Sequence, residues 1–193
     1  MWEEDAPVRT LATQADTTLD RLVQDARRLR FTTNHDETMW DAPPPALFGG
    51  LEGSKAAFVL ATSMPGAPLV YNGQELGVTD SVSFFARTPY DWTRQPEIRG
   101  FFRDYLNLYN ESSALQAGTL TVHTPEAEDA LVYERTANDE TMLVAANVRD
   151  ASQTVSVPEA YADASLTNAL TGEIMEGDTL SLGPYGYRLL RVE

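Results

Sequence analysis

Apolar residues recur at helical spacing in three N-terminal segments of the chain, residues 16–26, 55–64 and 98–109. The last is the clearest, because Ile98, Phe102, Tyr105 and Tyr109 share one helical face and polar residues lie between them. Two short apolar runs, residues 29–33 and 67–71, separate the segments and are typical of buried strands. The order helix, strand, helix, strand, helix predicts an α/β unit with a parallel sheet and crossover helices.

From residue 119 onward the pattern changes to short apolar or alternating runs at residues 120–122, 130–135, 141–147, 153–157 and 187–192. Turn signals separate them, namely Asn138-Asp139, Thr171-Gly172 and Gly183-Pro184. This spacing predicts a small antiparallel β-sandwich. Because the change falls near residues 111–118, we predict two domains, residues 1–116 and 117–193.

Composition excludes several classes of function. The chain has 193 residues, 42% of them hydrophobic, and 14 basic against 29 acidic residues give a net charge of −15. This charge repels phosphate backbones and anionic lipid, so we expect no nucleic-acid partner and no membrane surface. The absence of cysteine removes disulfides and thiolate chemistry, and two histidines are too few for a multi-histidine metal centre. The longest apolar run, residues 56–64, is far shorter than the ~20 residues of a membrane span.

The strongest candidate for chemistry is the polar cluster Asn34-His35-Asp36, which follows the predicted strand 29–33. In parallel α/β folds, side chains at the carboxyl ends of strands commonly form the functional site. The same three residues also suit a turn in which their side chains bond to nearby backbone, and the spacing alone leaves both readings open.

A second segment, residues 64–77, reads Met-Pro-Gly-Ala-Pro-Leu-Val-Tyr-Asn-Gly-Gln-Glu-Leu-Gly. Together with Phe31-Thr32-Thr33-Asn34-His35-Asp36, it resembles the end of the catalytic barrel in the α-amylase family, glycoside hydrolase family 13. The first segment matches the signature at the end of the seventh barrel strand, and residues 64–77 match the eighth strand and its loop. The resemblance therefore implies the last quarter of a TIM (β/α)8 barrel followed by a β-sandwich.

The resemblance also implies roles for individual residues. Asp36 corresponds to the family's third catalytic carboxylate, which bonds sugar hydroxyls and stabilises the transition state, and His35 corresponds to an imidazole that binds the same sugar. Asn34 is expected to hold the loop. Trp40 and Trp92 can stack on sugar faces or simply pack. Tyr71 and Glu75 also match motif positions, and for them we favour packing and loop anchoring.

The nucleophile and the acid/base of the family lie on the fourth and fifth barrel strands, and no segment before residue 30 encodes such strands. Arg103-Asp104 and Arg149-Asp150 look superficially like the nucleophile segment, but neither lies in a barrel-strand context. The resemblance thus implies part of a retaining glycosidase that acts on α-glucan oligosaccharides and is inactive alone. A missing N-terminal barrel segment, or self-association, is expected to cover the exposed faces. The alternatives are a non-catalytic carbohydrate-binding or accessory protein, and a structural remnant without a ligand.

We assign no metal and no cofactor to this chain, because the family's structural calcium is bound mainly by the absent part. The resemblance suggests a secreted or periplasmic parent, while the compartment of this chain stays unassigned. His123 has no partner pattern and is expected to be a surface imidazole, and residues 126–129 to be a solvated acidic turn.

Overall fold

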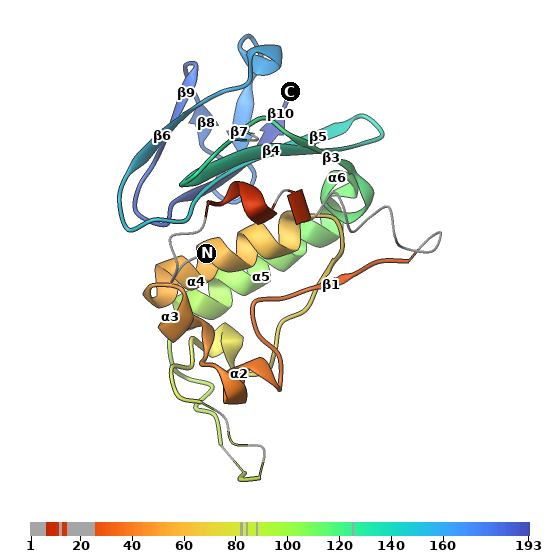
Figure 1. Ribbon diagram of the computed structural model, residues 1–193. Coiled ribbons are helices and arrows are strands. Elements are labelled where there is room, and N and C mark those ends of the chain that lie inside the picture. Colours follow the sequence, from red (N-terminus) through yellow and green to blue (C-terminus); the bar gives the residue numbers. More distant parts are fainter. Residues whose placement is uncertain are drawn as a thin grey trace.

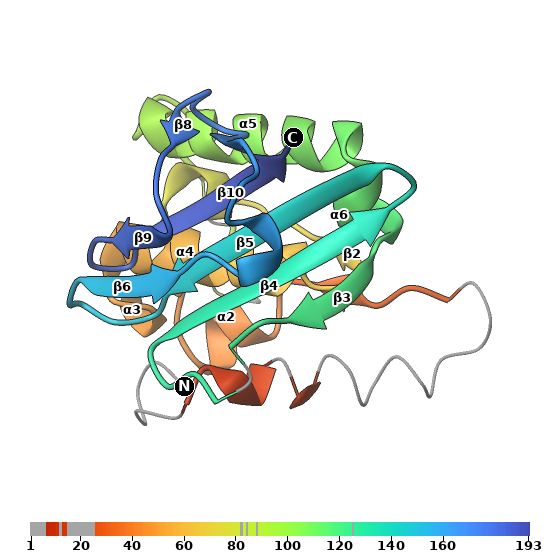
Figure 2. The ribbon, with the colours of Figure 1, turned by 90° about the horizontal axis from the view of Figure 1, so that it is seen from above.

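A computed structural model describes residues 7–11, 13–14, 26–81, 83, 85–87, 89–124 and 126–193. The main antiparallel sheet lies at the top of Figure 1, and helices α4 (Gly50–Ser63) and α5 (Pro96–Glu111) lie beneath it. The short helix α2 (Glu37–Trp40) lies on the far side of these helices from the sheet, and strand β1 (Leu29–Arg30), which pairs with β2 (Ala67–Pro68), lies beside them. Figure 2 shows the sheet from above, lying over α4 and α5.

The main sheet has the strand order β3-β4-β5-β10-β7-β8, and every neighbouring pair in it is antiparallel. A separate antiparallel pair, β6 with β9, completes the β part of the chain. The strand bounds are β3 Thr119–Val122, β4 Ala130–Ala137, β5 Glu140–Asn147, β6 Gln153–Ser156, β7 Leu166–Asn168, β8 Ile174–Met175, β9 Thr179–Leu182 and β10 Tyr187–Val192. This sheet arrangement agrees with the β-sandwich predicted for the C-terminal part.

Strands β7, β8 and β9 were not predicted from the sequence. Each has only two to four residues, and β7 and β9 carry polar side chains such as Thr167 and Ser181 that weaken the hydrophobic pattern. They are held by tertiary pairing instead, β7 against β10 and β9 against β6. A 3-10 turn, η2 (Glu159–Tyr161), lies between β6 and β7.

The main sheet is buried on both faces. Along β4, Leu131 and Tyr133 belong to the core under the helices, whereas Ala130 and Val132 belong to the core shared with β6 and β9. Strand β5 alternates in the same way. The helix-side core takes residues from α4 and α5 as well as from the sheet, so the predicted boundary between domains 1–116 and 117–193 crosses one continuous apolar cluster. The two-domain division stays a prediction.

Helix α4 begins earlier than predicted. The apolar spacing places its start at residue 55, directly after Ser54, but the Ser54 hydroxyl donates to the Gly50 carbonyl inside the helix at 2.8 Å. The helix is preceded by Gly49, which has a φ of 76° that favours glycine. A side chain at this position would also place its Cβ 2.2 Å from the hydroxyl of Tyr185, which lies in the turn before β10. The close approach of Tyr185 to the backbone of residue 49 therefore favours glycine there. A short helix, α3 (Pro44–Leu47), lies in the preceding loop.

Helix α5 confirms the predicted apolar stripe. It begins with Pro96 at its first position and carries Glu97 in its first turn, both of which favour a helix start. The Phe58 ring of α4 packs edge-on against Phe102 and Tyr105 of α5, with ring centroids 4.8 and 5.4 Å apart. The predicted helix at residues 16–26 lies outside the described residues except for its last position, while residues 9–11 and 13–14 are helical.

A buried arginine joins the helical layer to the sheet. Arg135 on β4 is 1% exposed, and its guanidinium donates to the carbonyl of Ser63, in the last turn of α4, and to the Gly118 carbonyl that precedes β3. Beside it, the Ser63 hydroxyl lies 2.5 Å from the Tyr133 hydroxyl. Burial raises the pKa of Tyr133 to about 12, so this phenol stays protonated near neutral pH. The end of α4 is thus tied to β4 by polar groups inside an apolar core.

Glu140 makes a second polar connection, at the start of the short helix α6 (Ser113–Ala117). Its carboxylate accepts from the hydroxyls of Ser112 and Ser113 at 2.6 and 2.8 Å and from the Ala114 N–H at 3.1 Å. Partial burial alone would raise the pKa of Glu140, but these hydrogen bonds outweigh it and lower the pKa below its usual value. The hairpin β4–β5 is therefore fastened to the C-terminal end of α5.

We predict that Arg135→Met lowers the free energy of unfolding by about 2–4 kcal/mol, because it leaves the buried carbonyls of Ser63 and Gly118 without donors. Urea unfolding followed by circular dichroism measures the change. Arg191→Met, at an exposed position of β10, is the matched control and should stay within about 0.5 kcal/mol of the parent. Equal losses in the two variants would show that Arg135 has no special role.

We also predict that Glu140→Gln destabilises the chain at pH 7 and destabilises it progressively less as the pH falls below the range of ordinary carboxyl groups. A carboxyl group whose pKa is lowered by folding stabilises the fold above its unfolded-state pKa, and this stabilisation is lost as the pH falls through the folded-state pKa. Unfolding curves of parent and variant at a series of pH values should therefore converge in acid. A difference that is constant from pH 7 to pH 3 would contradict the assignment.

Candidate functional site

The two strands that precede the candidate motifs lie side by side and run in the same direction. Leu29 pairs with Ala67 and Arg30 with Pro68 in a parallel register, and the Leu69 N–H continues the ladder by donating to the Arg30 carbonyl at 2.9 Å. Because parallel strands end at the same edge, the segments 31–36 and 69–77 emerge together. The strands are shorter than the predicted runs 29–33 and 67–71, since neither β1 nor β2 has a second strand partner among the described residues.

Gln74 fastens the two segments to each other. This residue lies in the 3-10 turn η1 (Gln74–Leu76) and is 8% exposed. Its Nε2 donates to the Thr32 hydroxyl at 2.7 Å, and its Oε1 accepts from the Tyr71 N–H at 3.3 Å. The sequence analysis did not single out Gln74. The signal was its place inside a motif in which we weighed only the neighbouring Tyr71 and Glu75.

Asn34 shapes the turn that presents Asp36. Its Oδ1 accepts from the N–H groups of Asp36 and Glu37 at 2.8 and 3.0 Å, as expected for a residue that holds the loop. Asp36 precedes helix α2, but its side chain makes no capping hydrogen bond. The Asp36 side chain is 59% exposed.

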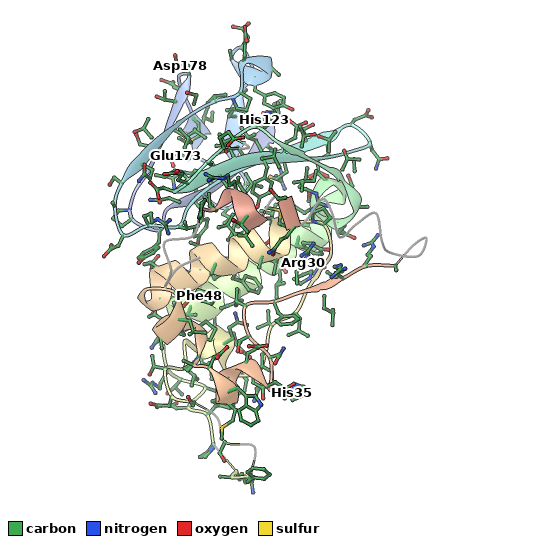
Figure 3. The ribbon with its side chains drawn as sticks, viewed as in Figure 1. Arg30, His35, Phe48, His123, Glu173 and Asp178 are labelled. Carbon is green, nitrogen blue, oxygen red and sulfur yellow. The ribbon has the colours of Figure 1, made fainter. Side chains whose placement is uncertain are left out.

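His35 lies beside this carboxylate, with its Nε2 3.5 Å from Asp36 Oδ1, and its side chain is 70% exposed. Figure 3 shows His35 at the end of the molecule opposite the main sheet, close to α2. An exposed imidazole and an exposed carboxylate in contact can donate to and accept from the same polar ligand. Both residues thus have hydrogen-bonding capacity that the described part of the chain leaves unused.

The two tryptophans differ in their relation to this turn. Trp40 lies one helical turn after Asp36, since the backbone N–H of Trp40 donates to the backbone carbonyl of Asp36 at 2.9 Å. The Trp40 residue is 78% exposed. Trp92 lies in the long loop before α5, where its carbonyl accepts from Arg99 at 2.7 Å, and it is about half exposed. The structure therefore brings Trp40 together with His35 and Asp36, and places Trp92 on a loop that reaches the same end of the molecule in Figure 1.

Glu75 has the loop-anchoring role that we favoured, whereas the packing role of Tyr71 stays a prediction. Glu75 accepts from the Gly73 N–H at 2.9 Å and so holds the turn after β2. The ring of Tyr90, which the sequence analysis missed, closes against Gly73, whose added Cβ would lie 2.6 Å from the ring. Burial, and then the neighbouring Tyr71 and Glu75, raise the pKa of Tyr90. Gly73 has a φ of 92°, which favours glycine, and a glycine at this place in the sequence is the signal that could have indicated such a close approach.

One expectation about other polar residues is wrong. His123 is not a bare surface imidazole, because its Nε2 lies 2.8 Å from Glu134 Oε2 and its ring packs edge-on against Tyr161. The hydroxyl of Tyr161, in η2, also donates to Glu134. The Glu134 carboxylate of β4 thus contacts both Tyr161 and His123, which follows β3. The acidic turn 126–129 lies between β3 and β4 with Glu126 and Glu128 exposed, as expected, and its backbone accepts from the N–H groups of residues 8 and 9.

Within the described ranges, no group of three or more His, Asp or Glu side chains is arranged to hold a metal ion. No described helix combines the length and apolar character needed to cross a bilayer. Arg103 and Asp104 pair with each other on α5, and Arg149 pairs with Asp129, at distances of 2.8 Å.

Comparison with known proteins relates the sequence of this chain to amylases. The model of the maltogenic amylase C-terminal domain matches residues 120–189, which form most of the β part. In sequence, the chain is 25% identical over 178 residues to an α-amylase 2 of Dictyoglomus thermophilum, and 30% identical over 147 residues to a neopullulanase 2 of Thermoactinomyces vulgaris. These alignments cover 85% and 69% of this chain, but only 29% and 25% of the relatives.

Solved structures share the fold. An Anoxybacillus α-amylase superposes with a TM-score of 0.83 at 17% identity, covering 97% of this chain and 43% of that one. AmyP in complex with maltose superposes with a TM-score of 0.70 at 19% identity, covering 92% and 43%. The fold is thus that of the C-terminal region of amylases. The chain belongs to the α-amylase family, glycoside hydrolase family 13, and corresponds to its C-terminal part.

We predict that Gln74→Ala loosens the segments 31–36 and 71–77 without unfolding the chain, because it removes the hydrogen bond to Thr32 that joins them and a second bond, to the Tyr71 N–H, that holds the turn 71–74. Amide hydrogen exchange in these segments should become faster by about tenfold, the effect of losing one to two hydrogen bonds of ordinary strength. Gln116→Ala, which removes a side-chain bond to the Asn110 carbonyl, is the matched control. Unchanged exchange at residues 31–36 in Gln74→Ala would contradict the role of Gln74.

Proposed function

We propose that this chain forms the last quarter of an α-amylase-type (β/α)8 barrel and the β-sandwich that follows it. Strands β1 and β2 are then the seventh and eighth barrel strands, and α4 and α5 are their helices. The parallel pairing of β1 with β2, with a helix between them in the chain, supports this assignment. The family's spacing of the two motifs supports it further.

The exposed apolar side chains around β1 suit the same proposal. Leu29 is 59% exposed and Phe31 38% exposed, although both belong to an apolar run that resembles a buried barrel strand. Neither strand has a second partner in the described ranges, so each offers an unpaired edge. The chain spans 25–29% of the length of the curated relatives, and we propose that a preceding barrel segment covers these surfaces.

The activity we propose for the complete protein is retaining hydrolysis or transfer of α-glucan oligosaccharides. Asp36 would accept hydrogen bonds from hydroxyls of the sugar at the scissile bond and strengthen them as the ring distorts toward the oxocarbenium-like transition state. His35 would bind the same sugar, and Trp40 and Trp92 would stack on neighbouring rings. One observation carries this proposal: Asn34 satisfies the backbone of the turn that follows β1, which leaves the Asp36 carboxylate exposed beside His35 and without a capping hydrogen bond.

A retaining glycosidase needs a nucleophile and an acid/base about 5–5.5 Å apart, and we propose that the preceding segment supplies both. The 193-residue chain alone is then inactive. The contribution of this chain to catalysis is one wall of the cleft, with one carboxylate and one imidazole.

The test joins this chain to the coding region upstream of it, or co-expresses the two parts, and assays release of sugars from maltotriose and starch. The joined protein should be active and the chain of residues 1–193 should not. Asp36→Asn should lower kcat/KM at least about a hundredfold, because several kcal/mol of transition-state bonding are lost.

Asp41→Asn is the matched control, since Asp41 is exposed and follows α2 directly. It should leave kcat/KM unchanged. Hydrolysis by residues 1–193 alone, or an Asp36→Asn variant as active as its parent, would overturn the proposal.

A further inference from the structure

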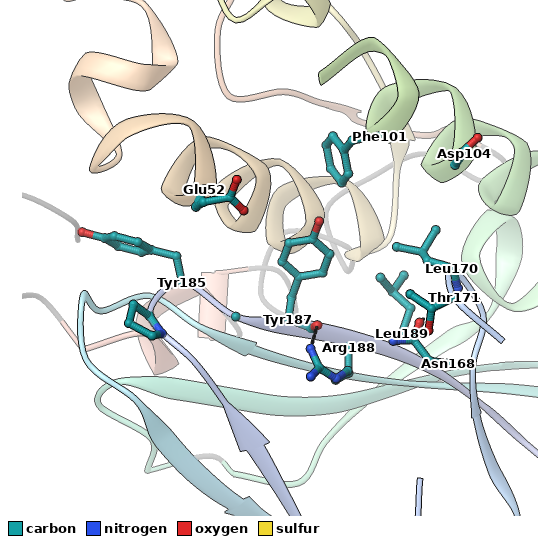
Figure 4. Close-up of a pocket in the computed structure, with 12 residues that line it drawn as sticks. Glu52, Phe101, Asp104, Asn168, Leu170, Thr171, Tyr185, Tyr187, Arg188 and Leu189 are labelled. Atoms are coloured by element: carbon teal, nitrogen blue, oxygen red, sulfur yellow. Dashed lines mark hydrogen bonds between the residues drawn. The ribbon is translucent and has the colours of Figure 1, made fainter. Parts of the chain in front are cut away.

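A second cleft lies far from Asp36, between the helical layer and the main sheet. Its volume is about 360 Å³, and residues of α4, α5, β10 and the turn after β7 line it. In Figure 4 the Tyr187 ring rises from β10 toward Phe101 of α5. The two ring centroids are 6.0 Å apart and the rings are inclined at 59°. The cleft therefore offers aromatic surface together with a space large enough for a small organic molecule.

The polar groups of this cleft have unused hydrogen-bonding capacity. The Tyr187 hydroxyl makes no hydrogen bond within the described part of the chain, although its side chain is largely buried. Burial, and then the nearby Glu52, raise the pKa of Tyr187, so the phenol remains a donor. Asn168 is 6% exposed and uses its Oδ1 to accept from the Leu170 N–H at 3.1 Å, which leaves its Nδ2 as a second donor.

Two carboxylates on the helical side supply acceptors. Glu52 of α4 pairs through one oxygen with Lys55 at 2.7 Å, and Asp104 of α5 pairs through one oxygen with Arg103 at 2.8 Å. Each keeps a second oxygen that has no partner in the residues described. Because both charges are already paired and Arg188 also lines the cleft, the lining has little net charge. A cation or an anion would gain little here, whereas a neutral ligand with hydroxyl groups finds both donors and acceptors.

The backbone holds one wall of the cleft in an unusual conformation. Tyr185 has a φ of 52°, which is rare for a side chain of this size. Its N–H donates to the Arg149 carbonyl at 2.9 Å, and its hydroxyl lies close to Gly49 at the start of α4. Tyr185 is therefore held at its backbone by Arg149 and at its hydroxyl end by Gly49.

We propose that this cleft is a second carbohydrate site, which binds a neutral saccharide of about one or two pyranose rings. The apolar face of a sugar ring would lie against Tyr187 and Phe101. Its hydroxyls would accept from the Tyr187 hydroxyl and Asn168 Nδ2 and donate to the free oxygens of Glu52 and Asp104. This inference stands on the cleft alone and does not require the activity proposed for Asp36.

The test is calorimetric titration of the 193-residue chain with maltotriose, with choline and inorganic phosphate as charged probes. Maltotriose should bind and the charged probes should not. Tyr187→Phe, which keeps the ring and removes the donor, should weaken maltotriose binding about fivefold. Tyr161→Phe removes a phenol hydroxyl outside the cleft and should leave the affinity unchanged. Thermal melting checks that each variant is folded.

Amide hydrogen exchange locates the bound sugar. Maltotriose should protect residues 168–171 and 185–189, and this protection should persist in Asp36→Asn, so that failure of this proposal is separable from failure of the catalytic one. The proposal is overturned if maltotriose does not bind, if Tyr187→Phe binds it as tightly as the parent, if a charged probe binds more tightly, or if protection falls instead on residues 31–40.

Discussion

The buried guanidinium of Arg135 joins the two layers of this molecule. It is enclosed by apolar and phenolic side chains, and its partners are backbone carbonyls at the end of α4 and before β3. A guanidinium removed from water must have its donors satisfied, and each donor here fixes the position of one element. The last turn of α4 is thereby held against β4, and the loop that follows it leads directly into β2. The position of the candidate site on the far side of the helices therefore depends on a contact made in the sheet.

Strong local patterns made some of these elements predictable. The stripe of α5 and the apolar runs of β4, β5 and β10 appear in the sequence because burial on a helix face or a strand requires it. The start of α4 was misplaced because the Gly49-Gly50 turn, and not Ser54, sets it. Strands β7 to β9 could not be found, since β7 and β9 carry polar side chains and β8 has only two residues, so that none has a period of its own.

The same contrast holds for the candidate site. His35, Asp36 and Trp40 are close in sequence, so a turn followed by a short helix brings them together. Gln74 and Tyr90 act through contacts with residues about 40 and 17 positions away, which no local pattern reveals. His123 was misjudged for the same reason, because its acceptor Glu134 lies on the neighbouring strand and Tyr161 reaches it from another loop. The cleft at Tyr187 joins four elements and has no sequence motif at all.

The double burial of β4 and β5 has a consequence for strand register. In a sheet with one wet face, a shift of one residue exposes the apolar set and is strongly disfavoured. Here both faces are dry, so a shift would exchange one apolar set for another and hydrophobicity alone would hardly oppose it. The register must instead come from features that cannot be exchanged: the Asn138 turn, with its φ of 54°, and the single cationic side chain of β4 that finds carbonyl partners on only one side. The few polar groups of the β4–β5 hairpin thus set its register, whereas its many apolar side chains stabilise the hairpin without favouring one register over another.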